Sequence, residues 1–106
     1  MQLDLWAGAG LRKNRLMKKH YHLFSLVMAL MHAQDELAAL RDDLGRPKPL
    51  LPDHKVLAGL QKLEDAARRK VTNGIYARFW KASSEKTNVR QNRLTRSEYF
   101  YRALTG

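Results

Sequence analysis

The sequence predicts an all-α protein, a small three- or four-helix bundle built on one long N-terminal helix. Residues 11–44 contain neither proline nor glycine, the residues that most often end a helix. No stretch of the chain alternates apolar and polar residues as a strand does. Apolar residues in the long stretch are spaced alternately by three and four positions, the a/d pattern of a packed helical seam. The seam consists of Leu23, Leu26, Leu30, Ala33, Leu37, Leu40 and Leu44.

Both ends of this helix, expected over residues 11–44, are marked by helix-breaking residues. Gly45 suits the position just beyond a helix C-terminus, and Pro47 cannot continue the helix. Residues 1–10 are expected to form a flexible lead-in, because they contain an Ala-Gly-Ala-Gly run. An apolar patch precedes that run, and it either folds back onto the core or docks on a partner. The patch consists of Leu3, Leu5 and Trp6.

A connector at residues 45–53 holds all three prolines and favours extended backbone. Leu50 and Leu51 are expected to hold it against the helices. Asp53 is a suitable N-cap for a second helix, which extends to about residue 72. The chain should therefore turn sharply between the long helix and a set of shorter C-terminal ones.

Two further short helices are predicted in the C-terminal part. The first covers residues 75–83, after a stop or kink at Asn73-Gly74. Residues 84–94 lack apolar periodicity and are expected to form a basic loop. The second helix covers residues 96–104, where Thr95 to Glu98 fit a capping box. The 106 residues are expected to fold as a single helical domain.

Charge is the unusual property of this composition. Twenty lysines and arginines face ten aspartates and glutamates, which gives a formal net charge of +10. Residues 1–22 carry a net charge of +4, residues 23–65 carry −2, and residues 66–106 carry +8. The commonest reason for such an excess is contact with a phosphate backbone. Anionic lipid and acidic proteins are the alternative partners.

Two basic clusters contain the candidate contacts to nucleic acid. Like charges so close together lower the stability of the fold unless a bound anion neutralises them. The alternative is that each cluster is a solvated face or loop. Arginine outnumbers lysine in the second cluster, which favours bidentate contact with phosphate. The first cluster is Arg12, Arg15, Lys18 and Lys19. The second is Arg68, Arg69, Lys70, Arg78, Lys81, Lys86, Arg90, Arg93, Arg96 and Arg102.

Aromatic residues lie among the basic residues of the second cluster. Phe79 and Phe100 fall at core positions of their helices. Trp80 and Tyr101 point elsewhere and are candidates for stacking on unpaired bases. The alternative for these two residues is the core, where aromatic side chains more often lie.

Several kinds of chemistry have no motif in this sequence. There is no cysteine, and the four histidines do not have metal-ligand spacing, so neither a metal nor another cofactor is expected. Nucleophile and phosphate-loop motifs are also missing, so we expect no enzyme. The N-terminus does not resemble a signal peptide, and the longest apolar stretch is too short to span a membrane. A cytoplasmic location is expected.

These observations favour a non-enzymatic nucleic-acid-binding protein, DNA- or RNA-binding, that contacts mainly the phosphate backbone. In size, charge and helicity the chain is similar to the small basic subunits of nucleoprotein complexes, so we expect a small subunit or an accessory factor. Other subunits or a second copy would pair with it through the heptad face of residues 23–44. The alternative is a protein-interaction module, an adaptor or inhibitor that docks on an acidic surface. Binding to a membrane surface is disfavoured, because the apolar face is separated from most of the charge.

Overall fold

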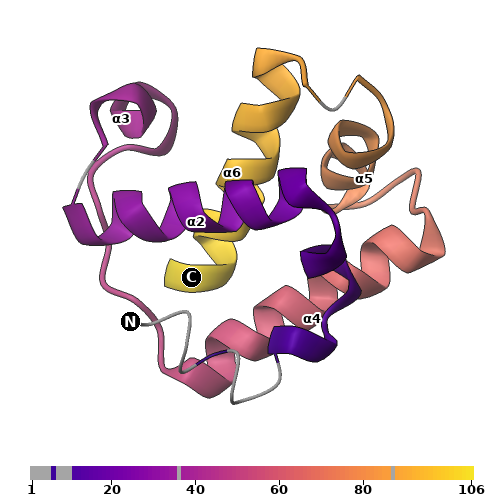
Figure 1. Cartoon of the computed structure of the whole chain (residues 1–106), viewed down its shortest axis with the longest axis horizontal. Coiled ribbons are helices and arrows are strands. Elements are labelled where there is room, and N and C mark those ends of the chain that lie inside the picture. The colour runs from indigo at the N-terminus through magenta and orange to yellow at the C-terminus, as the bar shows by residue number, and fades with distance from the viewer. Residues whose placement is uncertain (1–5, 7–10, 36, 87) are drawn as a thin grey trace.

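All the elements of the described residues are helical, which confirms the expected all-α bundle. The computed structural model describes residue 6 and residues 11–35, 37–86 and 88–106. Two short 3-10 turns come first, and α-helices follow (Figure 1). The elements are η1 (Leu11–Lys13), η2 (Arg15–Lys18), α2 (His20–Asp35), α3 (Ala38–Leu44), α4 (Asp53–Arg69), α5 (Ala77–Ser84) and α6 (Arg90–Thr105).

Helix α6 is the centre of the bundle. Helices α2, α4 and α5 all pack against it, and α3 also contacts it. In Figure 1, α2 crosses in front of α6, and α5 stands beside the beginning of α6. Because α6 has neighbours on several sides, polar as well as apolar residues of this helix are buried.

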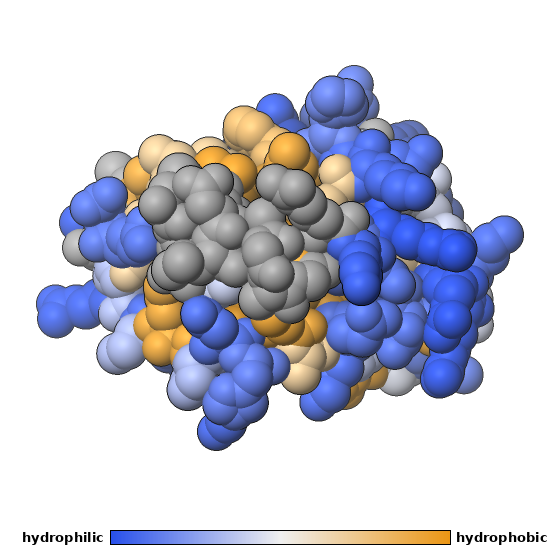
Figure 2. Space-filling view, turned by 60° about the horizontal axis from the view of Figure 1, so that its bottom comes forward, coloured by the Kyte–Doolittle hydropathy of each residue, from blue (hydrophilic) through white to orange (hydrophobic). Residues whose placement is uncertain are grey.

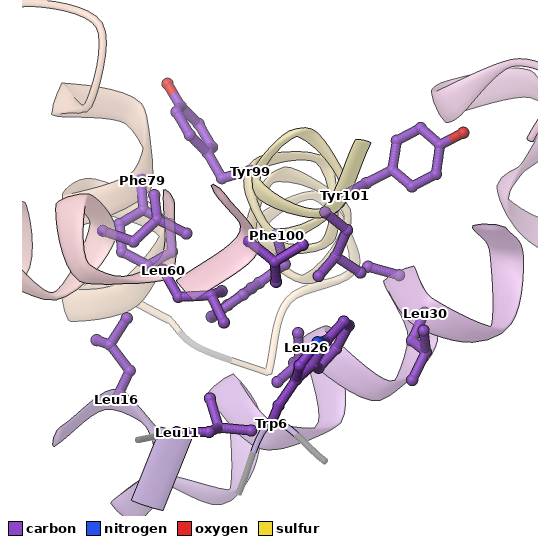
Figure 3. Packing of buried hydrophobic residues seen from close by; sticks show 14 residues of the cluster. Trp6, Leu11, Leu16, Leu26, Leu30, Leu60, Phe79, Tyr99, Phe100 and Tyr101 are labelled. Atoms are coloured by element: carbon purple, nitrogen blue, oxygen red, sulfur yellow. The ribbon is translucent and has the colours of Figure 1, made fainter. Parts of the chain in front are cut away.

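The hydrophobic core lies where these helices meet. Phe100 of α6 is fully buried, and its ring packs edge-on against Phe79 of α5 with the centroids 5.8 Å apart. The prediction that both phenylalanines belong to the core is confirmed. Tyr99 and Tyr101 leave α6 in opposite directions on either side of Phe100 (Figure 3). Burial of such large rings supplies much of the apolar area that stabilises a small domain.

Trp6 also belongs to the core, beside Leu26 of α2 (Figure 3). Its side chain is fully buried, and its indole Nε1 donates a hydrogen bond to Oδ1 of Asp53 at 2.9 Å. Of the N-terminal apolar patch, this residue therefore packs onto the helices. Leu3 and Leu5 lie outside the described residues.

The prediction of one unbroken helix over residues 11–44 is wrong, and the first break lies at Asn14. The Asn14 side chain accepts a hydrogen bond from the Leu16 amide at 2.9 Å and donates one to the Leu60 carbonyl at 3.1 Å. Asparagine offers the backbone such an alternative to helical bonding. Residues 11–18 therefore form two 3-10 turns, and Lys19 is extended before α2 begins.

A second break separates α2 from α3 at Leu37, whose backbone is extended. Nδ1 of His32 accepts a hydrogen bond from the Leu37 amide at 3.0 Å. Nε2 of the same ring lies 2.8 Å from the Gly45 carbonyl, to which it donates. The fully buried His32 ring thus satisfies one backbone group on each side of α3. Gly45 ends α3 with a φ of 75°, as its position in the sequence predicts.

The proline-rich connector is held against the bundle. Leu50 and Leu51 are half-buried against the core, as expected, and the Leu51 amide donates to the Leu104 carbonyl at 2.8 Å. Pro52 takes the N-cap position that the sequence assigns to Asp53, which instead becomes the first residue of α4. An acid there still favours the helix, because it lies in the first turn near the positive end of the dipole.

Helix α6 begins at Arg90, so the prediction of a loop through residue 94 is wrong. The side-chain amide of Asn92 donates to the carbonyls of Glu85 and Lys86 and closes the turn between α5 and α6. Thr95 is not a cap, because its hydroxyl donates to the Gln91 carbonyl within the helix. A polar first turn explains why apolar periodicity does not reveal this start.

Much of the heptad seam is used inside the chain. Leu26, Leu30 and Leu40 are buried, whereas Leu23 is 40% exposed. Phe24, next to Leu23 in α2, is 55% exposed. The exposed apolar surface of α2 therefore coincides only in part with the predicted seam.

Candidate nucleic-acid interface

The structure places most of the predicted nucleic-acid contacts on the surface. Hydrophilic side chains gather on the right-hand side of the face in Figure 2, the side on which α4 ends in Figure 1. The Arg12 side chain lies outside the described residues. The predicted residues with exposed side chains are Arg15, Lys18, Lys19, Arg68, Arg69, Lys70, Arg78, Lys81, Lys86, Arg90, Arg93 and Arg102.

One cleft brings residues of the two basic clusters together. It lies between the η2–α2 junction, the end of α4 and helix α5, and has a volume of about 230 Å³. We call it the Trp80 cleft. Its first-cluster residues come from one end of the sequence and its second-cluster residues from beyond the connector. The residues that line it include Arg15, Lys19, Tyr21, His22, Arg68 and Trp80.

Two acidic side chains, Glu64 in the cleft and Asp65 outside its lining, bond to basic residues of the cleft. Oε2 of Glu64 accepts a hydrogen bond from the Arg15 amide at 2.6 Å. Arg68 forms a salt bridge with Asp65 at 3.1 Å, between side chains that are well exposed to solvent. Exposed pairs of this kind contribute little to stability, so the Arg68 guanidinium remains available to an anion. Lys19 forms no salt bridge within the part of the chain that the structure describes.

Tyr21 and His22 form the floor of the cleft. The Tyr21 hydroxyl donates to the Ser83 carbonyl at 3.1 Å and joins α2 to α5. The His22 ring packs against Phe79 and Phe100, with centroid distances of 5.5 and 5.9 Å. Burial, together with the positive charges of Arg96 and Lys19, lowers the pKa of His22 from its ordinary value to about 4. His22 is therefore neutral at pH 7 and adds no charge to the cleft.

Trp80 is half-buried and lines two neighbouring depressions. Besides the Trp80 cleft, it borders a hollow of about 290 Å³ that Arg78 and Lys81 also line. The Trp80 indole thus borders two hollows, each of which is also lined by basic residues. Part of the Trp80 side chain is therefore accessible at both of them.

Arg96 and Tyr101 do not lie on the surface, so their prediction as contacts is wrong. Arg96 is 1% exposed, and its Nη1 donates to the Ala82 carbonyl at 2.7 Å. Tyr101 is 4% exposed. Its hydroxyl accepts from the Lys48 amide at 2.8 Å and donates to the Arg46 carbonyl at 3.3 Å. Both side chains join α6 to other parts of the bundle.

Other predicted contacts lie outside the Trp80 cleft. Arg78 and Arg102 both pair with Glu98, at 3.6 and 2.7 Å. Arg90 and Arg93 lie in the first turn of α6, where the helix dipole disfavours cations. Arg68 and Arg69, by contrast, lie in the last turn of α4, where the dipole favours them. The helix dipole thus gives a structural reason for the position of these two arginines.

Tyr21 is a cleft residue that the sequence prediction missed. Its position directly after the first basic cluster is the signal that points to it.

Within the described residues, no group of three His, Cys, Asp or Glu side chains has the geometry of a metal site. Every helix of that part of the chain is too short or too polar to cross a lipid bilayer. Compared with known proteins, no family model, curated protein or solved structure matches this chain.

Proposed function

We propose that this chain is a non-enzymatic nucleic-acid-binding protein that holds the phosphate backbone at the Trp80 cleft. The supporting observation is that Arg15 and Lys19 line the same cleft as Arg68, although the connector separates them in the sequence. A backbone that enters this cleft meets cations from both of its sides. The protein then serves as a small subunit or accessory factor of a nucleoprotein complex.

Physical chemistry favours phosphate as the ligand of these cations. Nucleic-acid backbones carry closely spaced charges, and each phosphate that a protein neutralises releases counterions into solution. Arginine forms two parallel hydrogen bonds to a phosphate, and Lys19 adds a mobile point charge. The net charge of +10 raises the local concentration of any polyanion before the cleft is occupied.

The aromatic residues of the cleft favour a strand with unpaired bases. Stacking of a base on an aromatic side chain contributes roughly 1–3 kcal/mol and depends little on sequence. In duplexes the bases are already stacked, so Trp80 has nothing comparable to contact there. We therefore expect single strands to bind more tightly than duplexes of the same length, with little sequence preference.

The test compares two triple variants that each remove three positive charges. Arg15→Ala/Lys19→Ala/Arg68→Ala empties the cleft of its cations. Lys48→Ala/Lys55→Ala/Lys62→Ala removes three exposed cations that do not line it. Fluorescence anisotropy with labelled DNA and RNA, single- and double-stranded, measures affinity between about 50 and 200 mM salt.

The cleft variant should lower the slope of log affinity against log salt by about two to three, because each phosphate contact contributes about 0.7–0.9. The control variant should change the slope much less. Equal losses in the two variants would mean that general charge, rather than the cleft, determines binding. If wild-type protein binds none of the four nucleic acids at low salt, the proposed function is wrong.

A further inference from the structure

A third hollow, of about 410 Å³, lies between α4 and α6. It shares no lining residue with the Trp80 cleft. We call it the α4–α6 groove, and it is an open trough rather than an enclosed cavity. The residues that line it include Ala58, Gly59, Ile75, Tyr76, Tyr99 and Ala103.

Small residues form the floor of the groove. At Gly59 an added Cβ would lie 3.2 Å from both Cα and Cβ of Ala103, so α4 and α6 cross almost backbone to backbone. Ala58 next to it is exposed. A pair of small residues at a close helix crossing leaves room above it, into which larger apolar side chains of a partner can fit.

Ile75 stands at the edge of the groove with 78% of its surface exposed. The backbone around it is fixed, because its carbonyl accepts a hydrogen bond from the Tyr99 hydroxyl at 2.5 Å. The neighbouring Tyr76 ring packs near the Tyr99 ring, with 6.2 Å between the two ring centroids. The large apolar side chain of Ile75 is thus exposed to solvent on a well-ordered part of the backbone. Its burial by a partner would be favourable.

The rim of the groove is basic. Lys55 and Lys62 are exposed on α4 and lie seven residues apart, which is about two helical turns or roughly 10 Å. Neither lysine forms a salt bridge in the described part of the chain. Arg102 lies across the groove on α6, paired with Glu98. The groove therefore offers apolar contact in the middle and positive charge at its sides.

We propose that the α4–α6 groove binds an acidic amphipathic helix of a partner protein. Its apolar side chains would cover Ile75, Ala58 and Ala103, and carboxylates two turns apart would pair with Lys55 and Lys62. Helices that lay an apolar face into a groove are a common mode of peptide recognition. A phosphate backbone matches the rim but leaves the apolar centre uncovered, so the charge and the apolar surface together favour a helix. This site is independent of the proposed nucleic-acid function.

The probes are three synthetic helical peptides that differ in one property each. The first has a row of leucines flanked by glutamates at two-turn spacing. The second replaces the leucines by glutamine, and the third replaces the glutamates by lysine. Binding to the full chain is measured by anisotropy, and the contact surface by amide chemical-shift changes. Only the first peptide should bind, with shifts at the groove residues.

Two charge-reversal variants provide the matched comparison. Lys55→Glu/Lys62→Glu should weaken binding of the first peptide by at least about tenfold, which is about 1.4 kcal/mol. Lys81→Glu/Lys86→Glu changes the net charge equally away from the groove and should have little effect. Ile75→Ser should also weaken binding several-fold, and circular dichroism checks that each variant remains folded.

Several outcomes would overturn the proposal. One is no binding of the first peptide to wild-type protein, and another is equal binding of the glutamine peptide, which would indicate charge alone. Shifts confined to the exposed Phe24 face of α2 would place the partner elsewhere. Self-association of wild-type protein that Lys55→Glu/Lys62→Glu abolishes would make the occupant a second copy. The affinity of wild-type protein for single-stranded nucleic acid is measured separately, so that a failure of the groove proposal can be told apart from a failure of the proposed function.

Discussion

The guanidinium carbon of Arg96 lies 4.9 Å from the centroid of the Tyr21 ring. A cation over an aromatic face is attracted by the negative charge of that face, most strongly where water is excluded. Burial lowers the pKa of Arg96; Tyr21 shifts it upward and Arg93 shifts it downward. Arginine remains charged even so, and this buried contact joins α6 to α2 directly behind the Trp80 cleft.

Replacement of Arg96 should lower stability much more than replacement of Arg93. Arg96→Ala leaves a cavity and an unpaired Ala82 carbonyl, so the free energy of unfolding should fall by about 3 kcal/mol. Arg96→Met should cost less, because methionine fills the space without a charge to desolvate. The exposed Arg93→Ala should change stability by less than about 0.5 kcal/mol. Urea denaturation measures all three, and similar losses for Arg93 and Arg96 would contradict the buried role.

The spacing of apolar residues predicts the helices well but cannot reveal where long-range hydrogen bonds break them. Alternating three- and four-residue steps correctly indicate α2 as the central part of the 11–44 stretch. The break at Asn14 depends on Leu60, which is 46 positions away. The break at Leu37 depends on a histidine ring that turns back onto the chain. Neither partner can be identified from local sequence.

Below about pH 6.5, His22 should make the protein less stable as the pH falls. The unfolded chain binds a proton near the ordinary histidine pKa of 6.5, whereas folded His22 binds one only near its lowered pKa of about 4. The unfolded state therefore takes up more protons between these values, and stability falls as the pH drops through them. The loss reaches about 3 kcal/mol, since each pKa unit is worth about 1.4 kcal/mol.

His22→Phe separates this effect from other titrating groups. A phenyl ring preserves the contacts with Phe79 and Phe100 but binds no proton. Urea unfolding at pH 7 and pH 4.5 should show a loss of stability in the variant that is smaller by about 2–3 kcal/mol. An identical pH dependence in the two proteins would show that His22 is protonated as easily when folded as when unfolded.

Charge clusters are visible in the sequence, but the direction of each side chain depends on the surrounding helices. Arg90, Arg93 and Arg96 share a three-residue spacing that indicates a single basic surface. Arg96 lies four residues before Phe100, so the two share a helix face, and that face is the one that α6 turns to the core. The cleft depends further on how η2 meets the end of α4, which no local pattern contains.

The hydrogen bond between Trp6 and Asp53 should contribute to stability beyond the burial of the indole. Trp6→Phe preserves an aromatic ring but loses the bond to Oδ1, and should cost about 1–2 kcal/mol. Trp6→Ala removes the whole fully buried side chain and should cost about 3–5 kcal/mol. Urea denaturation should rank the two variants in this order. Equal stability of Trp6→Ala and wild type would mean that Trp6 does not pack in the core in solution.

Trp80 should report the binding of single strands directly. The chain has two tryptophans, so Trp6→Phe leaves Trp80 as the sole indole fluorophore. A base that stacks on this half-buried ring should quench its emission, and single strands should quench it more than duplexes. Trp80→Leu should weaken single-strand binding by about tenfold, within the 1–3 kcal/mol that stacking contributes. The salt slope should not change, because Trp80 carries no charge.

Tyr101→Phe is the matched control for this experiment, because Tyr101 is aromatic and lies near the basic residues in sequence but is buried. It should leave single-strand affinity unchanged and lower only stability, through loss of the hydroxyl bonds to Lys48 and Arg46. Equal quenching by duplex and single strand would place the bases away from the Trp80 ring. Undiminished affinity of Trp80→Leu would reduce the cleft to a site for phosphate alone.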